Sequence, residues 1–286
     1  MNIIQPTVEV WRQEPGVEGL YRHIERCARI CYRSESKGNM TSEEFVKKVL
    51  MKREHGRPLE FGTVTMRINW DDPDCMDMRR LSFANPWVIE RNGHIITNLR
   101  LLIERFPDKW QHMLTHYLEV DRPTIDPNVY RPTFLWHISR GIADEFRTHV
   151  TLSGLMESTR WVNYKKKGLD FILPRWAVGL NFEDSYRPAE DSEDMRLYMW
   201  MRHNQRTEED YLELLRLGLK PENARGVLNL DIATHLVQCG FDIHWENFFD
   251  KRLASDAHPD AQYIAKKAKE VSKFDFYEGL SNNKAE

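Results

Sequence analysis

Cysteine is scarce in this sequence, and its four residues form no CxxC pair of the kind that binds metal or carries redox chemistry. Cys27 and Cys31 can share one helical face, but two thiols alone make a poor metal site. Cys239 lies in an apolar run, where a structural role is more common than a reactive one. We therefore expect no metal centre, and reduced thiols in a cytoplasmic protein.

Long apolar runs and a charge excess are also absent. No apolar run approaches the ~18 residues that a membrane span needs, and the opening MNIIQPTVEVWRQEPG turns polar too early for a secretory signal. Lysine and arginine number 41 against 44 acidic residues, which gives a net charge of -3. Because general nucleic-acid and membrane binders normally carry a basic excess, we expect neither partner. This charge balance does not exclude a local basic pocket that binds a small anion.

The motifs of several common enzyme classes are missing as well. The sequence contains no GxSxG, no HExxH, no glycine-rich phosphate loop and no GxGxxG. His244 and His258 have no obvious metal-binding partners in the sequence. Templates built on those motifs therefore fit poorly.

The patterns that are present predict both strands and helices. Period-two alternation of apolar residues predicts strands, and apolar residues at helical spacing predict helices. Thr41 and Glu44 form a capping box that opens one further helix, for which Gly56 is a plausible stop. The predicted strands are 7–13, 59–70, 133–139 and a hairpin over 87–97 that turns at Asn92-Gly93. The predicted helices are 17–33, 98–118, 191–218 and 260–273.

The order of these elements predicts the fold class. A polar loop is expected over 71–80, and 224–252 shows long apolar periodicity. Strands and helices mix without a βαβαβ rhythm, which favours an α+β fold over a doubly wound one. No proline- or glycine-rich linker divides the chain, so we expect a single domain over 1–286.

Hydrogen-bond donors are concentrated in EFRTHVTLSGLMESTRW, residues 145–161. If the stretch is helical, Glu145 and His149 share one face. At its end, Ser158 and Arg160 offer a hydroxyl and a planar guanidinium, which suit a phosphate or a carbonyl edge. Two interpretations are open: a solvated polar surface, which is the usual role of charged runs, or an anion-binding site.

A second segment, ENARGVLNLDIATHLVQCGFDIHWENFFDKR (222–252), places Arg225, Asn247 and Arg252 among apolar neighbours. Apolar segments rarely bury arginine unless it is paired or binds a ligand. The two arginines therefore indicate either the second half of an anion site or intrachain ion pairs. The candidate carboxylate partners are Glu222, Asp242, Glu246 and Asp250.

Together the two segments resemble the flavin-dependent thymidylate synthase family (ThyX). The first is similar to the family signature R-H-R-x-x-S-x-N-x-x-S-x-R-Y, with matches at His149, Ser153, Ser158 and Arg160 and with Trp161 in place of tyrosine. This segment and the three described next match the family in the same order and register, and four such matches are hard to obtain by chance.

Three other segments extend the resemblance. ARGVLNLDIATHL is similar to the family's A-R-x-x-L-P through Arg225, and NFFDKR is similar to N-F-L-x-L-R through Asn247 and Arg252. Upstream, HGRPLEFGTVTMRI resembles H-x-S-P-F-E-H-x-x-F-T-F. The likeness covers roughly 20–70 and 133–275, which leaves an insertion around 71–130 in a ThyX-like domain.

The departures concern positions that hold the flavin in the family. Both arginines beside the signature histidine are replaced, by Thr148 and Val150, although Arg147 lies one position early. The signature asparagine is Leu155, and the histidine after P-F-E is Phe61. The positions that bind deoxyuridylate in the family are matched by Ser158, Arg160, Arg225 and Arg252. By this resemblance, the positions that bind the nucleotide are kept, and several positions that hold the flavin carry different residues.

The resemblance implies a mixed or antiparallel sheet with long helices, a homotetramer with sites built from several chains, and a specific activity. That activity is the reductive methylation of dUMP at C5 to dTMP, with FAD as cofactor and with NADPH and methylenetetrahydrofolate as co-substrates. In the family, reduced flavin carries the one-carbon unit and no enzyme cysteine attacks the pyrimidine ring.

Residue roles follow from the same resemblance. Arg252 is the candidate for polarising the pyrimidine, because arginine stays protonated and donates in a fixed plane, and Ser158 is the second catalytic candidate. The expected substrate-binding residues are Glu145, Ser158, Arg160, Arg225 and Arg252, and the expected cofactor-binding residues are His149, Asn247 and Arg147.

Two alternatives to this activity are open. The chain can be a divergent member that binds a pyrimidine nucleotide without flavin chemistry, because flavin contacts are lost. It can also modify a related pyrimidine nucleotide, since the sequence does not distinguish dUMP from UMP.

Overall fold

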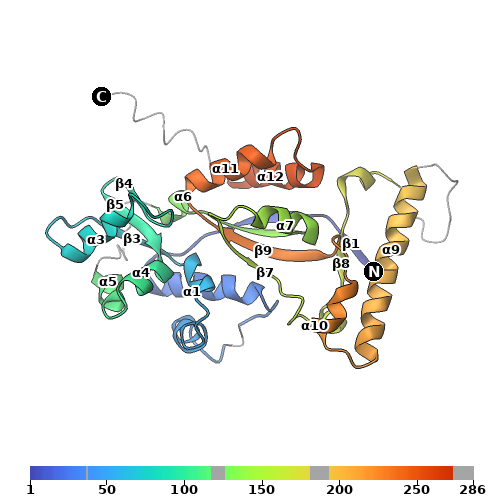
Figure 1. Ribbon diagram of the computed structural model, residues 1–286, viewed down its shortest axis with the longest axis horizontal. Coiled ribbons are helices and arrows are strands. Elements are labelled where there is room, and N and C mark those ends of the chain that lie inside the picture. The colour runs from blue at the N-terminus through green and yellow to red at the C-terminus, as the bar shows by residue number, and fades with distance from the viewer. Residues whose placement is uncertain (37, 117–125, 181–192, 273–286) are drawn as a thin grey trace.

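A four-stranded antiparallel sheet forms the centre of the molecule (Figure 1). The computed structural model describes residues 1–36, 38–116, 126–180 and 193–272. The strands run in the order β2–β6–β9–β7, so strands far apart in sequence are neighbours. Their bounds are β2 Thr7–Trp11, β6 Thr133–Ser139, β9 Ala233–Cys239 and β7 Ser153–Met156. The predicted strand over 133–139 is confirmed, and the one over 7–13 is confirmed for its first part.

Different helices cover the two faces of this sheet, because successive side chains of a strand point to opposite sides. Trp136 and Leu236 belong to a buried cluster with residues of α7, α11 and α12. Leu135 and Val237 belong to another cluster, which includes Cys27 of α1. Figure 1 shows α11 and α12 on one side of the sheet and α1 on the other. The helices are α1 Gly16–Ile30, α7 Arg140–Arg147, α11 Asp242–Arg252 and α12 Pro259–Ser272.

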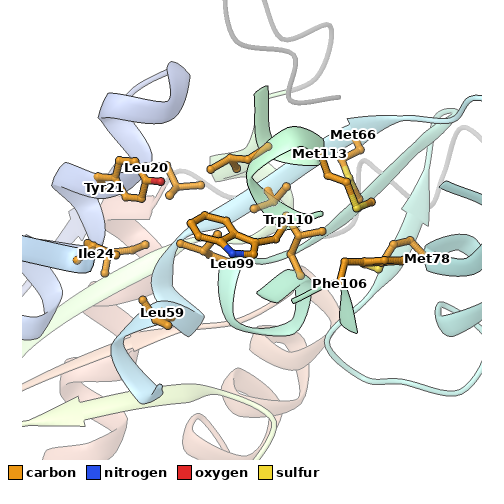
Figure 2. Close-up of a cluster of buried hydrophobic side chains, with 14 of the residues drawn as sticks. Leu20, Tyr21, Ile24, Leu59, Met66, Met78, Leu99, Phe106, Trp110 and Met113 are labelled. Carbon is orange, nitrogen blue, oxygen red and sulfur yellow. The ribbon is translucent and has the colours of Figure 1, made fainter. Parts of the chain in front are cut away.

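A second group of elements packs on the far side of α1, around a three-stranded antiparallel sheet. Its strands are β3 Thr63–Arg67, β5 His94–Asn98 and β4 Ile89–Arg91, in that order. The predicted hairpin turn is confirmed, since Asn92 and Gly93 join β4 to β5 with φ of 48° and 72°. Figure 2 shows the core of this group, where Leu20 and Ile24 of α1 lie near Leu99 and Trp110.

Helices complete this second group. They are α3 Pro73–Leu81, α4 Leu99–Arg105, α5 Trp110–His116 and α6 Pro127–Tyr130. The helix predicted over 98–118, of which 117–118 lie outside the described residues, is two helices in its described part. Pro107 lies in the break between them because proline lacks the N–H that a helix interior needs.

The capping box predicted at Thr41 is confirmed. The Glu44 backbone N donates to Thr41 Oγ1 at 3.2 Å, and the Thr41 backbone N donates to Glu44 Oε2 at 3.1 Å. The short helix α2 (Ser42–Glu44) continues as a π-helix, η1 (Phe45–Met51). It ends before Gly56, which instead precedes the 3-10 helix η2 (Arg57–Phe61).

The remaining elements lie beside the central sheet. The strands β1 (Asn2–Ile4) and β8 (Asp170–Ile172) pair in parallel. The long helix α9 (Glu193–Arg216) confirms the prediction over 191–218, of which 191–192 lie outside the described residues. The others are α8 Tyr164–Lys167, η3 Arg175–Ala177, α10 Pro221–Ala224 and η4 Arg225–Val227.

In the second group of elements, one sequence prediction is wrong and another is confirmed only in part. The polar loop predicted over 71–80 is mostly the helix α3. Asp72 caps it by accepting from the Cys75 backbone N at 2.9 Å, and Pro73 occupies its first turn, where a missing N–H costs nothing. The strand predicted over 59–70 is confirmed for Thr63–Arg67, and it begins only there because the preceding residues form η2.

The helical interpretation of 145–161 is also wrong beyond its first residues. The helix α7 ends at Arg147, and the chain then turns and enters β7 at Ser153. Strand β7 is held at the sheet edge by pairing with β9, so tertiary pairing decides the local structure here. The α+β class with antiparallel sheets is confirmed. None of the described helices combines the length and apolar composition needed to cross a lipid bilayer.

Candidate functional site

The turn that follows β7 carries two of the predicted substrate-binding residues. The Ser158 backbone N donates to the Cys31 carbonyl at the end of α1, at 2.9 Å. The Ser158 carbonyl in turn accepts from the backbone N of Trp161 and of Val162, at 3.1 and 2.9 Å. These bonds fix a compact turn against α1 and leave the Arg160 side chain exposed.

Arg225 reaches the same turn from a distant part of the sequence. Its Nη1 donates to Thr159 Oγ1 at 3.3 Å, so Ser158, Arg160 and Arg225 are brought to one place. Arg225 is exposed rather than buried, which corrects the expectation drawn from its apolar neighbours in sequence. Within the described residues it forms no ion pair with Glu222, so its guanidinium keeps N–H groups for a ligand.

A cavity of about 1160 Å³ adjoins this turn. Leu155 and Trp161 line it from the β7 side, and His55 and Arg57 line it from the segment around η2. Tyr32, after the end of α1, completes the aromatic part, with its ring centroid 6.2 Å from that of Trp161. The cavity thus joins the two segments that resemble separate ThyX motifs.

The chemical character of the cavity differs from wall to wall. Leu155, Tyr32 and Trp161 are apolar or aromatic, and the latter two expose 47% and 60% of their surface toward solvent. Arg57 and Arg100 line another part, where the buried carboxylate of Glu60 accepts from them at 3.4 and 2.7 Å. Such a cavity suits a ligand that combines a flat apolar ring with anionic groups.

Cys31 also lines this cavity, where burial disfavours its thiolate. Burial raises the pKa of Cys31 to about 11, so the thiol stays protonated near neutral pH. Since the thiolate is the nucleophile, Cys31 is a poor candidate for attack on a bound ring. All four cysteines are free, as the sequence predicted.

Arg252 forms the centre of a second cluster, with Glu145 and His149. Its Nη1 donates to Glu145 Oε2 at 2.9 Å, and its Nη2 donates to the Glu145 carbonyl at 2.6 Å. Nη2 also donates to Thr148 Oγ1 at 3.1 Å, and Nε donates to His149 Nε2 at 3.0 Å. Within the described part of the chain, these four hydrogen bonds leave one guanidinium N–H, on Nη1, for a ligand.

The cluster changes the expected partners of Arg252 and the state of His149. The carboxylate partner of Arg252 is Glu145, and within the described residues Asp242, Glu246 and Asp250 do not pair with it. Burial, together with the nearby Arg252 charge, lowers the pKa of His149 to about 4. His149 is therefore neutral near pH 7 and accepts the Nε hydrogen.

The two clusters lie on different sides of the molecule. Arg252 and Glu145 belong to α11 and α7, which cover one face of the central sheet, whereas the 1160 Å³ cavity lies beside α1 on the other. Arg147 is exposed and pairs with Asp144 at 3.3 Å, and Asn247 is exposed as well. Within one chain, the residues predicted to hold a cofactor do not line the cavity.

Several residues of the cavity escaped the sequence predictions. His55 and Arg57 stand in the segment resembling H-x-S-P-F-E-H, so that resemblance was a usable signal for them. Tyr32 had none, because only the docking of α1 against the turn at Ser158 brings it next to Trp161. In the described part of the chain, no group of three or more histidine, cysteine or acidic side chains is placed to hold a metal ion.

Comparison with known proteins gives one match to a family model and several to solved structures. The model described as thymidylate synthase complementing protein matches residues 129–274, a little over half of the 286-residue chain. A UMP/dUMP methylase PolB from Streptomyces cacaoi bound with 5-Br UMP is 15% identical, with 95% of this chain and 91% of that chain covered and a TM-score of 0.46. The complex of the same protein with 5-Br dUMP is 16% identical, with 95% of this chain and 92% of that chain covered and a TM-score of 0.45. No curated protein matches the chain.

Proposed function

The chain belongs to the thymidylate synthase complementing protein family, and from this premise we propose that it methylates a pyrimidine nucleotide at C5. The proposed reaction is the conversion of dUMP to dTMP with methylenetetrahydrofolate, FAD and NADPH. The observation that carries the proposal is the meeting of two ThyX-like segments in one cavity. Leu155 and Trp161 come from one segment and His55 and Arg57 from the other, and the Ser158 turn stands at its edge.

The Ser158 turn supplies the groups that a nucleotide phosphate needs. Arg160 and Arg225 bring two guanidiniums, and the Ser158 hydroxyl is a further donor. Guanidinium groups bind phosphate oxygens in pairs, which orients the nucleotide as well as holding it. Fixing the phosphate in this way places the attached ring in a defined position, and such positioning lowers the barrier to a reaction between bound partners.

The cavity residues also fit a flavin. Tyr32 and Trp161 offer aromatic surface for its ring system, and Arg53 and Arg57 offer positive charge for its phosphates. Bound there, the flavin would supply reducing equivalents and pass the one-carbon unit. The chain's own residues would orient the ring and exclude water through Leu155, while Cys31 keeps its proton.

Arg252 is the proposed electrostatic catalyst. It stays protonated, and its plane is fixed by Glu145 and His149, so its remaining Nη1 hydrogen has a preset direction. A donor held in this way stabilises charge that develops on a pyrimidine oxygen without having to reorganise during the reaction. The cluster lies on the other face of the sheet from the cavity, so we propose that Arg252 serves the cavity of another subunit in a homotetramer.

The loss of family flavin contacts supports a second candidate function. Leu155 lines the cavity where the family signature has asparagine, so the side-chain amide is missing, and Arg147 forms an ion pair with Asp144. A divergent member with these features binds a pyrimidine nucleotide without flavin chemistry, or modifies a related nucleotide.

One set of spectra separates the candidates. We expect the purified protein to be yellow, or to take up added FAD, with an absorbance band of oxidised flavin that shifts when dUMP is added. Arg57→Gln should weaken FAD uptake, and Arg225→Gln should weaken dUMP binding while FAD uptake is retained. A protein that stays colourless with added FAD yet binds dUMP would establish the second candidate. UMP in place of dUMP tests the choice of sugar.

A further inference from the structure

A second cavity, of about 790 Å³, lies on the other side of the C-terminal part of α1. Its volume is in the range of small-molecule sites, which is roughly 300–1,000 Å³. Arginines predominate among its charged lining residues, and serines and one histidine accompany them. They are Arg22, Arg26, Arg29 and Arg33, the acids Glu25 and Glu35, and Ser34, Ser36, Ser42 and His235.

Two of the four arginines are already engaged by protein carboxylates. Arg22 pairs with Glu14 and Glu18. Arg29 donates from Nε and Nη2 to Glu25 Oε1 at 2.8 and 2.6 Å. These two arginines are therefore structural, and a ligand would find little free capacity on them.

Arg26 and Arg33 keep most of their donors. In the described residues Arg26 has no carboxylate partner, and its guanidinium lies 3.6 Å above the centroid of the Trp11 ring. Stacking of this kind fixes the guanidinium plane and leaves its N–H edges free. Among the residues that the structure describes, Arg33 has one polar side-chain contact, a long one from Nη2 to Asp170 Oδ2 at 3.5 Å. The guanidiniums of Arg26 and Arg33 are thus held in place while most of their N–H groups remain available to a ligand.

His235 adds a third ligand group, and a buried carboxylate determines its orientation. Glu157 is 1% exposed, and its Oε2 lies 3.0 Å from His235 Nδ1 while its Oε1 accepts from the Tyr164 hydroxyl at 2.9 Å. Glu157 accepts the proton of Nδ1 and so orients the ring, and in the imidazolium form the Nε2–H donates to a phosphate oxygen. His137 stacks on the ring with centroids 4.1 Å apart, which restricts its rotation.

From these groups we propose that the 790 Å³ cavity is a second ligand site, and that it binds a phosphate-bearing small molecule through Arg26, Arg33 and His235. Guanidinium forks match the tetrahedral array of phosphate oxygens, and serine hydroxyls at the rim add donors. Glu157 is a positioning residue, because it acts through His235. The site differs from the cavity of the proposed methylation and does not depend on that function.

Isothermal titration of the full chain with inorganic pyrophosphate tests the inference. We expect saturable binding to the wild type, weakened at least tenfold in Arg26→Gln and in Arg33→Gln. His235→Gln should also weaken binding, and Arg26→Lys should fall between wild type and Arg26→Gln because it keeps charge but loses the fork. Arg12→Gln is the matched control, since Arg12 is exposed and outside the cavity.

Titration with dUMP separates this site from the proposed methylation site. Arg225→Gln should weaken dUMP binding and leave pyrophosphate binding unchanged, and Arg26→Gln should do the reverse. Melting curves of each variant confirm that the protein is folded. Where Arg26→Gln or Arg33→Gln is not folded, the lysine variant at the same position replaces it. Absence of pyrophosphate binding, or its loss in Arg225→Gln rather than in Arg26→Gln, would overturn the inference. Inorganic phosphate in place of pyrophosphate shows whether one phosphoryl group is enough.

Discussion

Arg252 shows how much a single side chain can be fixed before any ligand arrives. Its side chain is 16% exposed and bound on three edges by Glu145, Thr148 and His149. The sequence predicted a role for Arg252 and Glu145 in one site, and the structure joins them directly. It could not predict which carboxylate pairs with the arginine, because Glu145 is 107 positions away in sequence.

Replacement of Arg252 tests its proposed role. In Arg252→Ala we expect C5 transfer to fall by about 100-fold or more, the size of effect seen when one preorganised donor is removed from an active site. The circular dichroism spectrum should be unchanged. Arg216→Ala, which removes an exposed arginine paired with Glu213, is the control and should retain full turnover. Wild-type turnover in Arg252→Ala would rule out the assignment.

His149 gives the same cluster a dependence on pH. Its pKa is lowered from 6.5 to about 4, so the folded state holds it neutral where the unfolded chain would take up a proton. The corresponding stability is fully present above pH 6.5 and is lost as the pH falls toward 4. The urea midpoint should drop across this window, and His149→Gln should reduce the drop.

The control for this measurement is His203→Gln, because His203 is exposed on α9. It should follow the wild-type pH dependence. His23 and His137 have pKa values lowered to about 3 and about 4, chiefly by burial, so part of the drop will persist in any single variant. An unchanged drop in His149→Gln would show that the Arg252 contact does not require the neutral ring.

At the scale of elements, local signals predicted some structures and tertiary contacts decided others. The Asn92-Gly93 turn and the Thr41 capping box were predictable, because both rest on residues close in sequence. Strand β7 was not, because its conformation depends on pairing with β9, about 80 positions later. The Ser158–Arg225 part of the site could be predicted from a resemblance, whereas the position of Tyr32 depends on docking of α1.

Helix α3 was missed because its polar residues resemble a loop, yet its start has a clear cap. Asp72→Ala removes the acceptor for the Cys75 backbone N and should lower the free energy of unfolding by about 1 kcal/mol. Asp71→Ala, at the exposed neighbouring position, should change it little. Urea denaturation of the two variants and the wild type provides the comparison. Equal stabilities for both variants would show that the cap is not formed in solution.

At the scale of the whole molecule, the separation of the two clusters predicts cooperation between chains. Arg252 lies with α11 and Arg225 with the Ser158 turn, on different sides of the central sheet. If a homotetramer combines them in one site, Arg252→Ala and Arg225→Ala are each expected to be strongly impaired alone. Mixing the two variants under conditions of subunit exchange should restore part of the activity, because some sites then receive both arginines.

The mixing experiment needs evidence that exchange occurs. Labelled subunits followed by energy transfer provide it, and light scattering gives the mass of the assembly. Wild type mixed with Arg225→Ala is the matched control for dilution of active subunits. Confirmed exchange without restored activity would place both arginines in sites of the same chain, or outside the site altogether.

The two cavities share part of one wall, formed by Arg29 at the end of α1 and by Ser34 just after the helix. A ligand that shifts this shared wall when it binds in one cavity changes the shape of the other cavity. Heterotropic coupling between the two sites is then reciprocal: the factor by which pyrophosphate changes the dissociation constant of dUMP must equal the factor by which dUMP changes that of pyrophosphate. Arg29 and Ser34 are the shared residues through which binding at one site would change the affinity of the other.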